Sequence, residues 1–135
     1  ERILYQTEST RLTLGLIADY VRAENLDSGG NLPRIPPFRL GLQSRVSHNS
    51  WEAGVFLRHA FDQNRTAPGE TDTDGYTELE IDLSKRFVMS DIGEWTLFAQ
   101  AKNLLDEEIR HSTSYLKNVA PMPGRSIQLG ARFEF

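Results

Sequence analysis

The sequence predicts an all-β fold of antiparallel, up-and-down strands. Apolar and polar residues alternate in one segment after another, and this period of two indicates β-strand because successive side chains point to opposite faces. The predicted strands are about 9–12 residues long, above the mode of about 5–6 in globular proteins. The last nine residues show the alternation most clearly and end on the aromatic Phe135. We expect this closing strand, Ile127–Phe135, to pair with Trp95–Asn103 on one side.

Earlier segments repeat the pattern. In Arg11–Val21, for example, apolar residues occupy five successive even positions, which a helix would not produce. Ile17 and Phe98 are exceptions, because each is an apolar residue on an otherwise polar face. The predicted strands are Arg11–Val21, Phe38–Val46, Trp51–Phe61, Tyr76–Phe87, Glu94–Asn103 and Ile127–Phe135, with Arg2–Gln6 as a weaker candidate.

The connections alternate between short and long. The short ones are Thr7–Thr10, Ser47–Ser50 and Val88–Glu94, and the long ones are Ala23–Pro37, Asp62–Gly75 and Leu104–Arg125. Transmembrane β-barrels have short turns on the periplasmic side and longer loops outside, so one orientation accounts for every connection. Aromatic residues also lie near the predicted strand ends, as a girdle at each membrane interface requires: Tyr20, Trp51, Phe61, Trp95, Phe133 and Phe135.

These patterns favour a transmembrane barrel, and a soluble all-β binding module is the alternative that spacing leaves open. The two differ in the apolar face of the strands. In a barrel this face is exposed as an outward band, whereas in a soluble domain it is buried against a second sheet. The residues that decide are Leu12, Leu40, Val55, Ile81, Leu97 and Leu129.

Composition narrows the function classes. A hydrophobic fraction of 39% predicts a folded chain, and a net charge of -4 gives no reason to expect a nucleic-acid partner. No apolar run reaches the roughly 18 residues of a transmembrane helix. The chain has no cysteine, and no nucleophile motif or phosphate-binding glycine loop is present, so we expect no enzyme activity. The start of the sequence is not a signal peptide, so a barrel protein would have to be a longer chain than this one.

Two motifs near the end carry a resemblance to a known family. Asn103-Leu104-Leu105-Asp106-Glu107-Glu108 follows an alternating strand, and Pro123-Gly124-Arg125-Ser126 opens the last one. Together with the terminal Phe, they resemble the C-terminus of TonB-dependent outer-membrane receptors. Three further stretches are similar to the branch that includes zinc-uptake receptors: Asn31–Pro37, Ala67–Tyr76 and His111–Lys117.

The resemblance implies a 22-stranded barrel with an N-terminal plug domain in the bacterial outer membrane. Residues 1–135 would be its C-terminal portion, with about six strands and without the plug or the earlier strands. The family imports scarce nutrients, so the resemblance implies uptake of a metal ion such as zinc or of a metal chelate, with a siderophore or haem receptor as the alternative. No resident cofactor is implied. The implied partners are outer-membrane lipid, the plug and the remaining strands, the TonB complex through the missing N-terminal part, and the outer-membrane assembly machinery.

The predicted outer loops contain candidate metal ligands. Glu70, Asp72 and Asp74 cluster in one loop and His111 lies in another. Zinc takes imidazole nitrogen and carboxylate oxygen, so a capture site at the outer face is one hypothesis. The alternative is that these residues are solubilising loop charges, and no spacing typical of a metal site decides between the two.

Two further sets of residues have expected roles. A set of charged strand residues is expected to face the lumen, where they would meet the plug or only water: Arg39, Arg45, Arg58, Glu78, Glu80 and Asp82. The resemblance implies that the assembly machinery reads Phe135, with Phe133 and Leu129 on the same face. The alternative is that Phe135 is a core residue of a soluble strand. The sequence leaves open the substrate, the complete binding site, the plug contacts and the oligomeric state.

Overall fold

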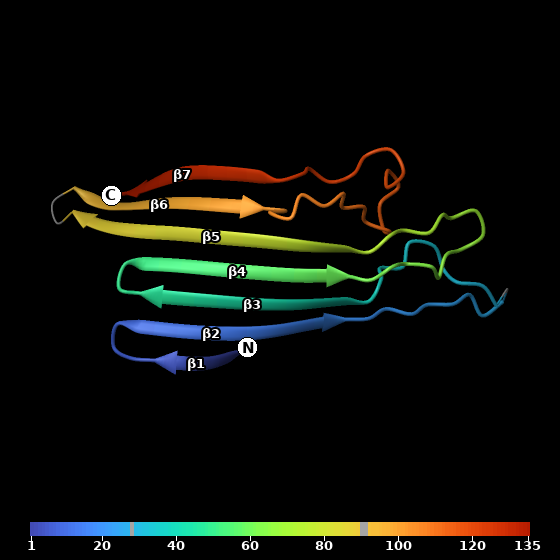
Figure 1. The fold of residues 1–135 in the computed structure, drawn as a ribbon, viewed down its shortest axis with the longest axis horizontal. Coiled ribbons are helices and arrows are strands. Elements are labelled where there is room, and N and C mark those ends of the chain that lie inside the picture. The colour runs from blue at the N-terminus through green and yellow to red at the C-terminus, as the bar shows by residue number, and fades with distance from the viewer. Residues whose placement is uncertain (28, 90–91) are drawn as a thin grey trace.

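The alternating segments form one antiparallel sheet. The computed structural model describes residues 1–27, 29–89 and 92–135. Within these residues the chain folds into a seven-stranded sheet in which each strand pairs with its neighbour in the sequence (Figure 1). The strands are β1 (Arg2–Gln6), β2 (Thr10–Asp19), β3 (Arg39–His48), β4 (Trp51–Ala60), β5 (Tyr76–Met89), β6 (Gly93–Lys102) and β7 (Ser126–Glu134). The predicted all-β, up-and-down fold is confirmed.

The strand boundaries differ from the predicted ones at the short turns. The weak candidate Arg2–Gln6 is the full strand β1, so the described residues contain seven strands and not about six. Thr10 and His48 were placed in turns, but they face each other as the first pair of the β2–β3 ladder. The predicted turn Val88–Glu94 is shorter, because β5 runs to Met89 and β6 begins at Gly93. Residues 90 and 91 of that turn lie outside the described residues.

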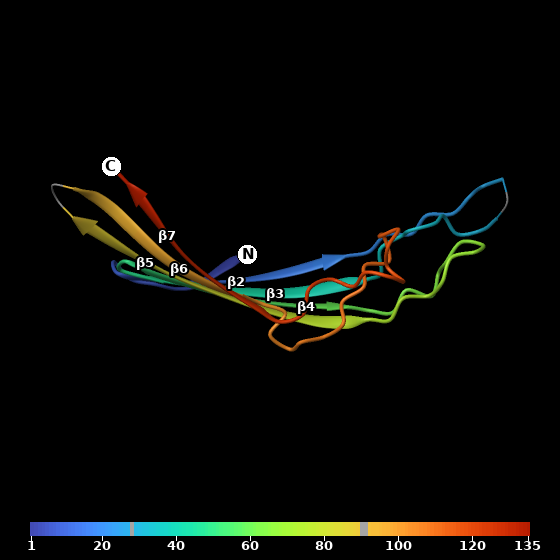
Figure 2. The ribbon, with the colours of Figure 1, turned by 90° about the horizontal axis from the view of Figure 1, so that it is seen from above.

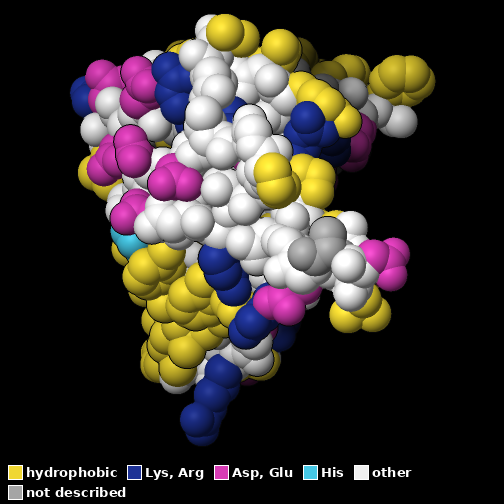
Figure 3. All heavy atoms as spheres, turned by 90° about the vertical axis from the view of Figure 1, so that its right-hand side faces the viewer, with side chains coloured by type: hydrophobic (Ala, Val, Ile, Leu, Met, Phe, Trp, Pro, Cys, Tyr) yellow, Lys and Arg dark blue, Asp and Glu magenta, His cyan; other side chains and the backbone are white. Residues whose placement is uncertain are grey.

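The register places the apolar residues on one face. Pairing is continuous from β2 to β7, and residues that face each other across it share a side of the sheet. One such row is Leu12, Val46, Ala53, Leu83, Ala99 and Leu129. In Figure 3, seen from the loop end, hydrophobic side chains gather in one continuous area beside Lys and Arg side chains.

This apolar face is open. Of the residues chosen to decide the fold, Leu40 and Val55 are each 43% exposed and Leu129 is 80% exposed. Ile81 and Leu97 are also exposed, and Leu12 is half-buried. In the part of the chain that the structure describes, no second sheet covers them. The exposed band is the result expected for a barrel segment. No helix among the described residues is long and apolar enough to cross a membrane.

The opposite face is polar, and two of its aromatic residues, Phe98 and Phe56, lie next to glycines of a neighbouring strand. A Cβ on Gly130 would approach the Phe98 ring to 2.3 Å, and one on Gly41 would approach the Phe56 ring to 3.3 Å. The missing side chains therefore leave the space that the rings occupy beside the neighbouring strand. This explains why Phe98 breaks the alternation of β6. Figure 2 shows that the sheet is curved along its length.

Aromatic contacts mark both ends of the strands. At the loop end, Phe38 stacks on Phe61 with ring centroids 5.2 Å apart, and Tyr20 contacts Phe38 edge-on. At the turn end, Trp95 and Phe133 face each other in the β6–β7 ladder with centroids 4.9 Å apart. The apolar band is thus bounded on both sides by rings, as the sequence predicts.

Candidate functional site: the loop cluster and the polar face

The three long loops gather at one end of the sheet. They connect β2 to β3 (residues 20–38), β4 to β5 (residues 61–75) and β6 to β7 (residues 103–125), and all leave the sheet at the same end (Figure 1). We call them the first, second and third long loops. Their side chains make the contacts described next, and we call the assembly the loop cluster.

One carbonyl joins all three loops. Ile35 of the first loop accepts hydrogen bonds from Gln63 Nε2 of the second loop, at 2.6 Å, and from Ser112 Oγ of the third loop, at 3.1 Å. Both donors are buried, each with 3% of its surface exposed. Because a buried polar group is costly to leave unpaired, these bonds hold the loops in one relative position.

A buried lysine ties the third loop to the second. Lys117 Nζ donates to Thr71 O at 2.5 Å and to Thr73 Oγ1 at 2.9 Å, and it lies 3.9 Å from the Glu70 carboxylate. Its side chain is only 8% exposed. Glu70 in turn accepts from the backbone N–H groups of Arg34 and Ala67. The amine is therefore surrounded by oxygen acceptors and is part of the structure of the cluster.

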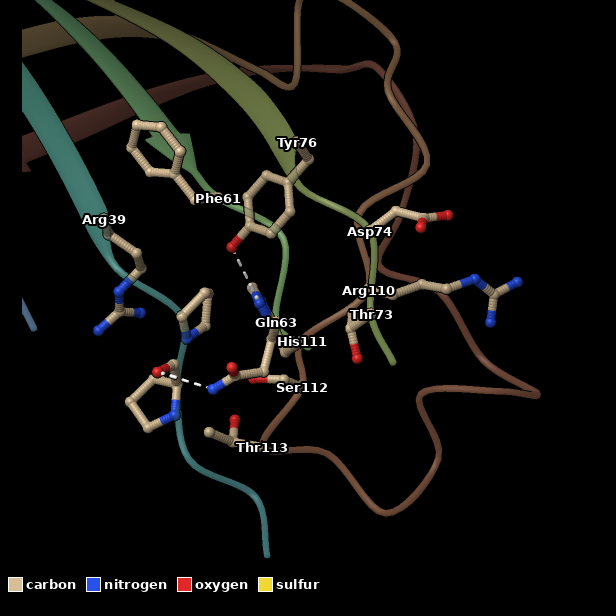
Figure 4. A pocket seen from close by; sticks show the side chains of 12 residues that line it. Arg39, Phe61, Gln63, Thr73, Asp74, Tyr76, Arg110, His111, Ser112 and Thr113 are labelled. Carbon is tan, nitrogen blue, oxygen red and sulfur yellow. Dashed lines mark hydrogen bonds between the residues drawn. The ribbon is translucent and has the colours of Figure 1, made fainter. Parts of the chain in front are cut away.

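His111 lies at the base of the cluster, above the polar face. Its Nδ1 is 3.1 Å from the hydroxyl of Tyr76, the first residue of β5 (Figure 4). Burial lowers the pKa of His111, and the positive charges of Arg58 and Arg39 lower it further, while Glu78 acts in the opposite direction. The surroundings of His111 thus favour its neutral form over its charged form.

A small pocket adjoins His111. Its volume is about 20 Å³, which is space for about one water molecule. Tyr76, Gln63 and Ser112 line it together with His111. In Figure 4 the Asp74 carboxylate is directed away from the His111 ring. The pocket as it stands does not accommodate a ligand larger than a water molecule or an ion.

The two resemblance motifs contact each other and close the third loop. Asn103 Nδ2 donates to Glu107 O at 2.9 Å and to Pro123 O at 3.3 Å, and Asn103 Oδ1 accepts from Glu107 N. Asp106 Oδ1 accepts from the backbone N–H of Arg125 at 2.9 Å. Asn103 has φ 47°, a left-handed conformation that asparagine tolerates better than most residues. These contacts explain why an asparagine and an aspartate are needed opposite the Pro-Gly-Arg turn.

Ion pairs cross the polar face between strands, and the pair of Arg45 on β3 with Asp82 on β5 passes over Gly54 of the intervening β4. Arg39 pairs with Asp19 at 2.8 Å. Arg45 lies 3.5 Å from Asp82, and Arg58 contacts Glu78. The six residues expected to face the lumen all lie on this face of the sheet: Arg39, Arg45, Arg58, Glu78, Glu80 and Asp82. Five of the six form ion pairs within the sheet, and whether any of the six meets a plug or only water stays a prediction. That they line a lumen stays a prediction.

The candidate metal ligands do not form one group. Glu70 is engaged by Lys117 and two backbone amides, Asp72 accepts from Thr66 Oγ1 at 3.4 Å, and His111 contacts Tyr76. Within the described residues, no three His, Cys, Asp or Glu side chains are grouped closely enough to hold a metal ion. Asp74 and His111 do line the same pocket. A role for these four residues in metal capture stays a prediction.

The comparisons address the fold. No protein-family model matches the chain. The solved structure of Copper transporter OprC is similar, with a TM-score of 0.77 and 20% sequence identity over 97% of this chain. The fold is similar to that of a barrel-type outer-membrane transporter. This chain spans 22% of the length of that transporter.

Sequence reasoning missed the residues that hold the cluster together. Lys117 stood only at the end of a resemblance stretch, and Gln63 and Ser112 were ordinary polar loop residues. One signal was present: Lys117 is the only lysine or arginine in residues 111–124. Its partners are more than 40 residues away in the sequence, so periodicity could not identify them.

Proposed function

We propose that this chain forms the closing strands of a TonB-dependent outer-membrane receptor that imports a metal ion or a metal chelate. Residues 1–135 would then be the C-terminal portion of the barrel, and the plug and earlier strands would belong to the same protein. The observation that carries the proposal is the single curved sheet with one open apolar face, bounded by aromatic rings at both ends. Such a face is stable in lipid and a liability in water.

The two kinds of connection give the orientation. Short turns lie at one end of the sheet and the interlocked long loops at the other, which supports a periplasmic turn end and an extracellular loop cluster. In this orientation the polar face lines the interior, and its ion pairs stand in an aqueous or plug-filled lumen. Phe135 would lie at the periplasmic rim, where the assembly machinery would read it with Phe133 and Leu129.

Metal is the substrate class with most support, and two metals are candidates. The solved relative in fold is named as a copper transporter, whereas the motif resemblance is to zinc-uptake receptors. His111 is the residue we assign to substrate contact in the loops, because a neutral imidazole is a ligand for both ions. Its partner Tyr76 fixes the ring by bonding Nδ1, which leaves Nε2 for a ligand.

Uptake by cells with and without the gene tests the proposal. Loss of the gene should lower the accumulation of either copper or zinc and slow growth when that metal is limiting, and loss of TonB should have the same effect. Uptake of siderophores and haem, measured in the same strains, covers the alternative substrates. Unchanged uptake of all of these would contradict the proposal.

A further inference from the structure

The apolar face of the long strands contains one basic residue. Along β2 to β7, Lys85 is the only lysine or arginine on that face among the residues that the structure describes. It pairs with Trp51 on β4 and with Leu97 on β6, both of which are apolar and exposed. A charge at this place needs an explanation, because every neighbour in its row of β4 to β7 is apolar.

The Lys85 amine lies between two aromatic rings. Its Nζ is 4.5 Å from the centroid of the Trp51 ring and 4.8 Å from that of Phe87. Cation–π attraction of this kind holds the amine in place but does not neutralise it. No carboxylate lies within 4.0 Å of the amine in the described part of the chain, although the arginines of the polar face named above have such partners. The positioned cation is therefore available to an anion from outside the sheet.

An apolar groove begins beside this amine. The groove has a volume of about 510 Å³. Its apolar lining includes Trp51, Leu83, Phe87, Leu97, Ala99 and Leu129. A hydrocarbon chain fits a surface of this composition, and the cation at its edge complements an anionic group attached to that chain. The site thus has the chemistry to bind an anionic amphiphile.

The position of Lys85 along its strand indicates which class of anionic amphiphile would bind. Lys85 pairs with Trp51, the first residue of β4, so it lies level with the β3–β4 turn. The β5–β6 hairpin extends beyond that turn (Figure 1) and places Phe87, Trp95 and Phe133 there. In the proposed orientation this is the periplasmic interface, where the charged headgroups of phospholipids meet the hydrocarbon core.

We propose that Lys85 and the groove beside it bind an anionic phospholipid, with the headgroup phosphate at Lys85 Nζ and an acyl chain along Leu83, Leu97 and Leu129. This inference rests on the proposed function, because it requires the apolar face to be in the membrane. Trp51 and Phe87 hold the amine at the height of the phosphates. The polar neighbour Arg86, on the opposite face of β5, is 3.7 Å from Glu94 and has no part in the site.

Quenching by spin-labelled lipids tests the site. The chain has no cysteine, so Ala131→Cys, in the same row as Lys85 and Leu97, gives a single attachment point on this chain for a bimane fluorophore. The intact protein is reconstituted in phosphatidylcholine vesicles that contain a small fraction of nitroxide-labelled phosphatidylglycerol or nitroxide-labelled phosphatidylcholine. The ratio of the two quenching constants gives the preference for the anionic lipid. It is measured for the wild type and for Lys85→Gln, Lys85→Arg and the control Arg86→Gln.

The wild type should prefer phosphatidylglycerol about fivefold, the effect of one basic residue near the membrane surface. Lys85→Gln should abolish the preference, while Lys85→Arg and Arg86→Gln should retain it. Equal quenching by both lipids in the wild type, or a preference that survives Lys85→Gln, would overturn the lipid site and leave the proposed function intact. No quenching by either lipid would mean that protein covers the groove, and it would overturn the proposed function as well.

Discussion

Replacing Lys117 by methionine tests whether one buried amine holds the second and third long loops together. Methionine keeps most of the side-chain volume but removes the donors to Thr71 O and Thr73 Oγ1 and the charge beside Glu70. A hydrogen bond to a charged group is worth about 1.5–3 kcal/mol, and relief of the buried charge offsets part of the loss. Glu70 keeps its two backbone donors, so it is not left unpaired. The net cost should be about 3 kcal/mol, which corresponds to roughly a 150-fold change in an opening equilibrium.

Hydrogen exchange of the loop amides measures this opening. The reciprocal bonds between Gln63 and Thr73 report on the second loop, and the bond from Met122 N to Ile109 O reports on the third. In Lys117→Met these amides should exchange roughly 150-fold faster, while amides of the central ladder between β3 and β4 should not change. Lys102→Met, at the end of β6, is the control. Protection that is unchanged in Lys117→Met, or reduced equally in both variants, would refute the reasoning.

Three further predictions concern single residues. Gly93→Ala should loosen the end of β7 by about 2 kcal/mol or more, because Gly93 has φ 132° and a Cβ would lie 2.3 Å from Glu134 O. Hydrogen exchange of the β7 amides measures this loosening, and it should be faster than in the control Gly29→Ala, which changes a loop glycine with open space around it. The third loop should open as pH falls through about 6.5 and below, because the pKa of the half-buried His111 is lowered and the open state therefore binds a proton more readily. Hydrogen-exchange rates of the loop amides, corrected for the pH dependence of intrinsic exchange, should show this opening, and His111→Gln should remove it. Asn103→Ala should raise the rate of protease cleavage in the third loop at least tenfold, since Glu107 N, Glu107 O and Pro123 O lose their partner. A cleavage rate equal to that of the wild type would contradict the role of Asn103 in closing the loop.

Strand placement could be predicted from the sequence because period two is a local property. Each strand lies within a few residues of its predicted position, and the alternation of apolar and polar residues correctly assigns side chains to the two faces of the sheet. Phe98 could not be placed by that rule, since its position depends on Gly130 in the neighbouring strand. The turn boundaries at Thr10 and His48 were missed because small polar residues are as compatible with a strand end as with a turn.

The loop cluster could not be predicted, because its contacts join residues far apart in the sequence. Acidic loop residues suggested metal ligands, and the structure shows Glu70 as the acceptor for two backbone amides and as the ion-pair partner of Lys117. One contact in the cluster did have a signal in the sequence: the motifs that begin at Asn103 and Pro123 carry the same family resemblance, and the two motifs contact each other in the structure. Residue type alone does not distinguish a carboxylate that organises a loop from one that binds a cation.

The most direct test of this account is the environment of the two faces of β6. A nitroxide placed at each of residues 96–101 in turn, in the reconstituted protein, reports the accessibility of that position to oxygen and to a water-soluble nickel chelate. We predict a period of two, with oxygen favoured at Leu97, Ala99 and Ala101 and not at Phe98 or Gln100. Nickel accessibility without alternation, or low accessibility to both reagents at Leu97 and Ala99, would contradict the claim that the apolar face of this sheet lies in lipid.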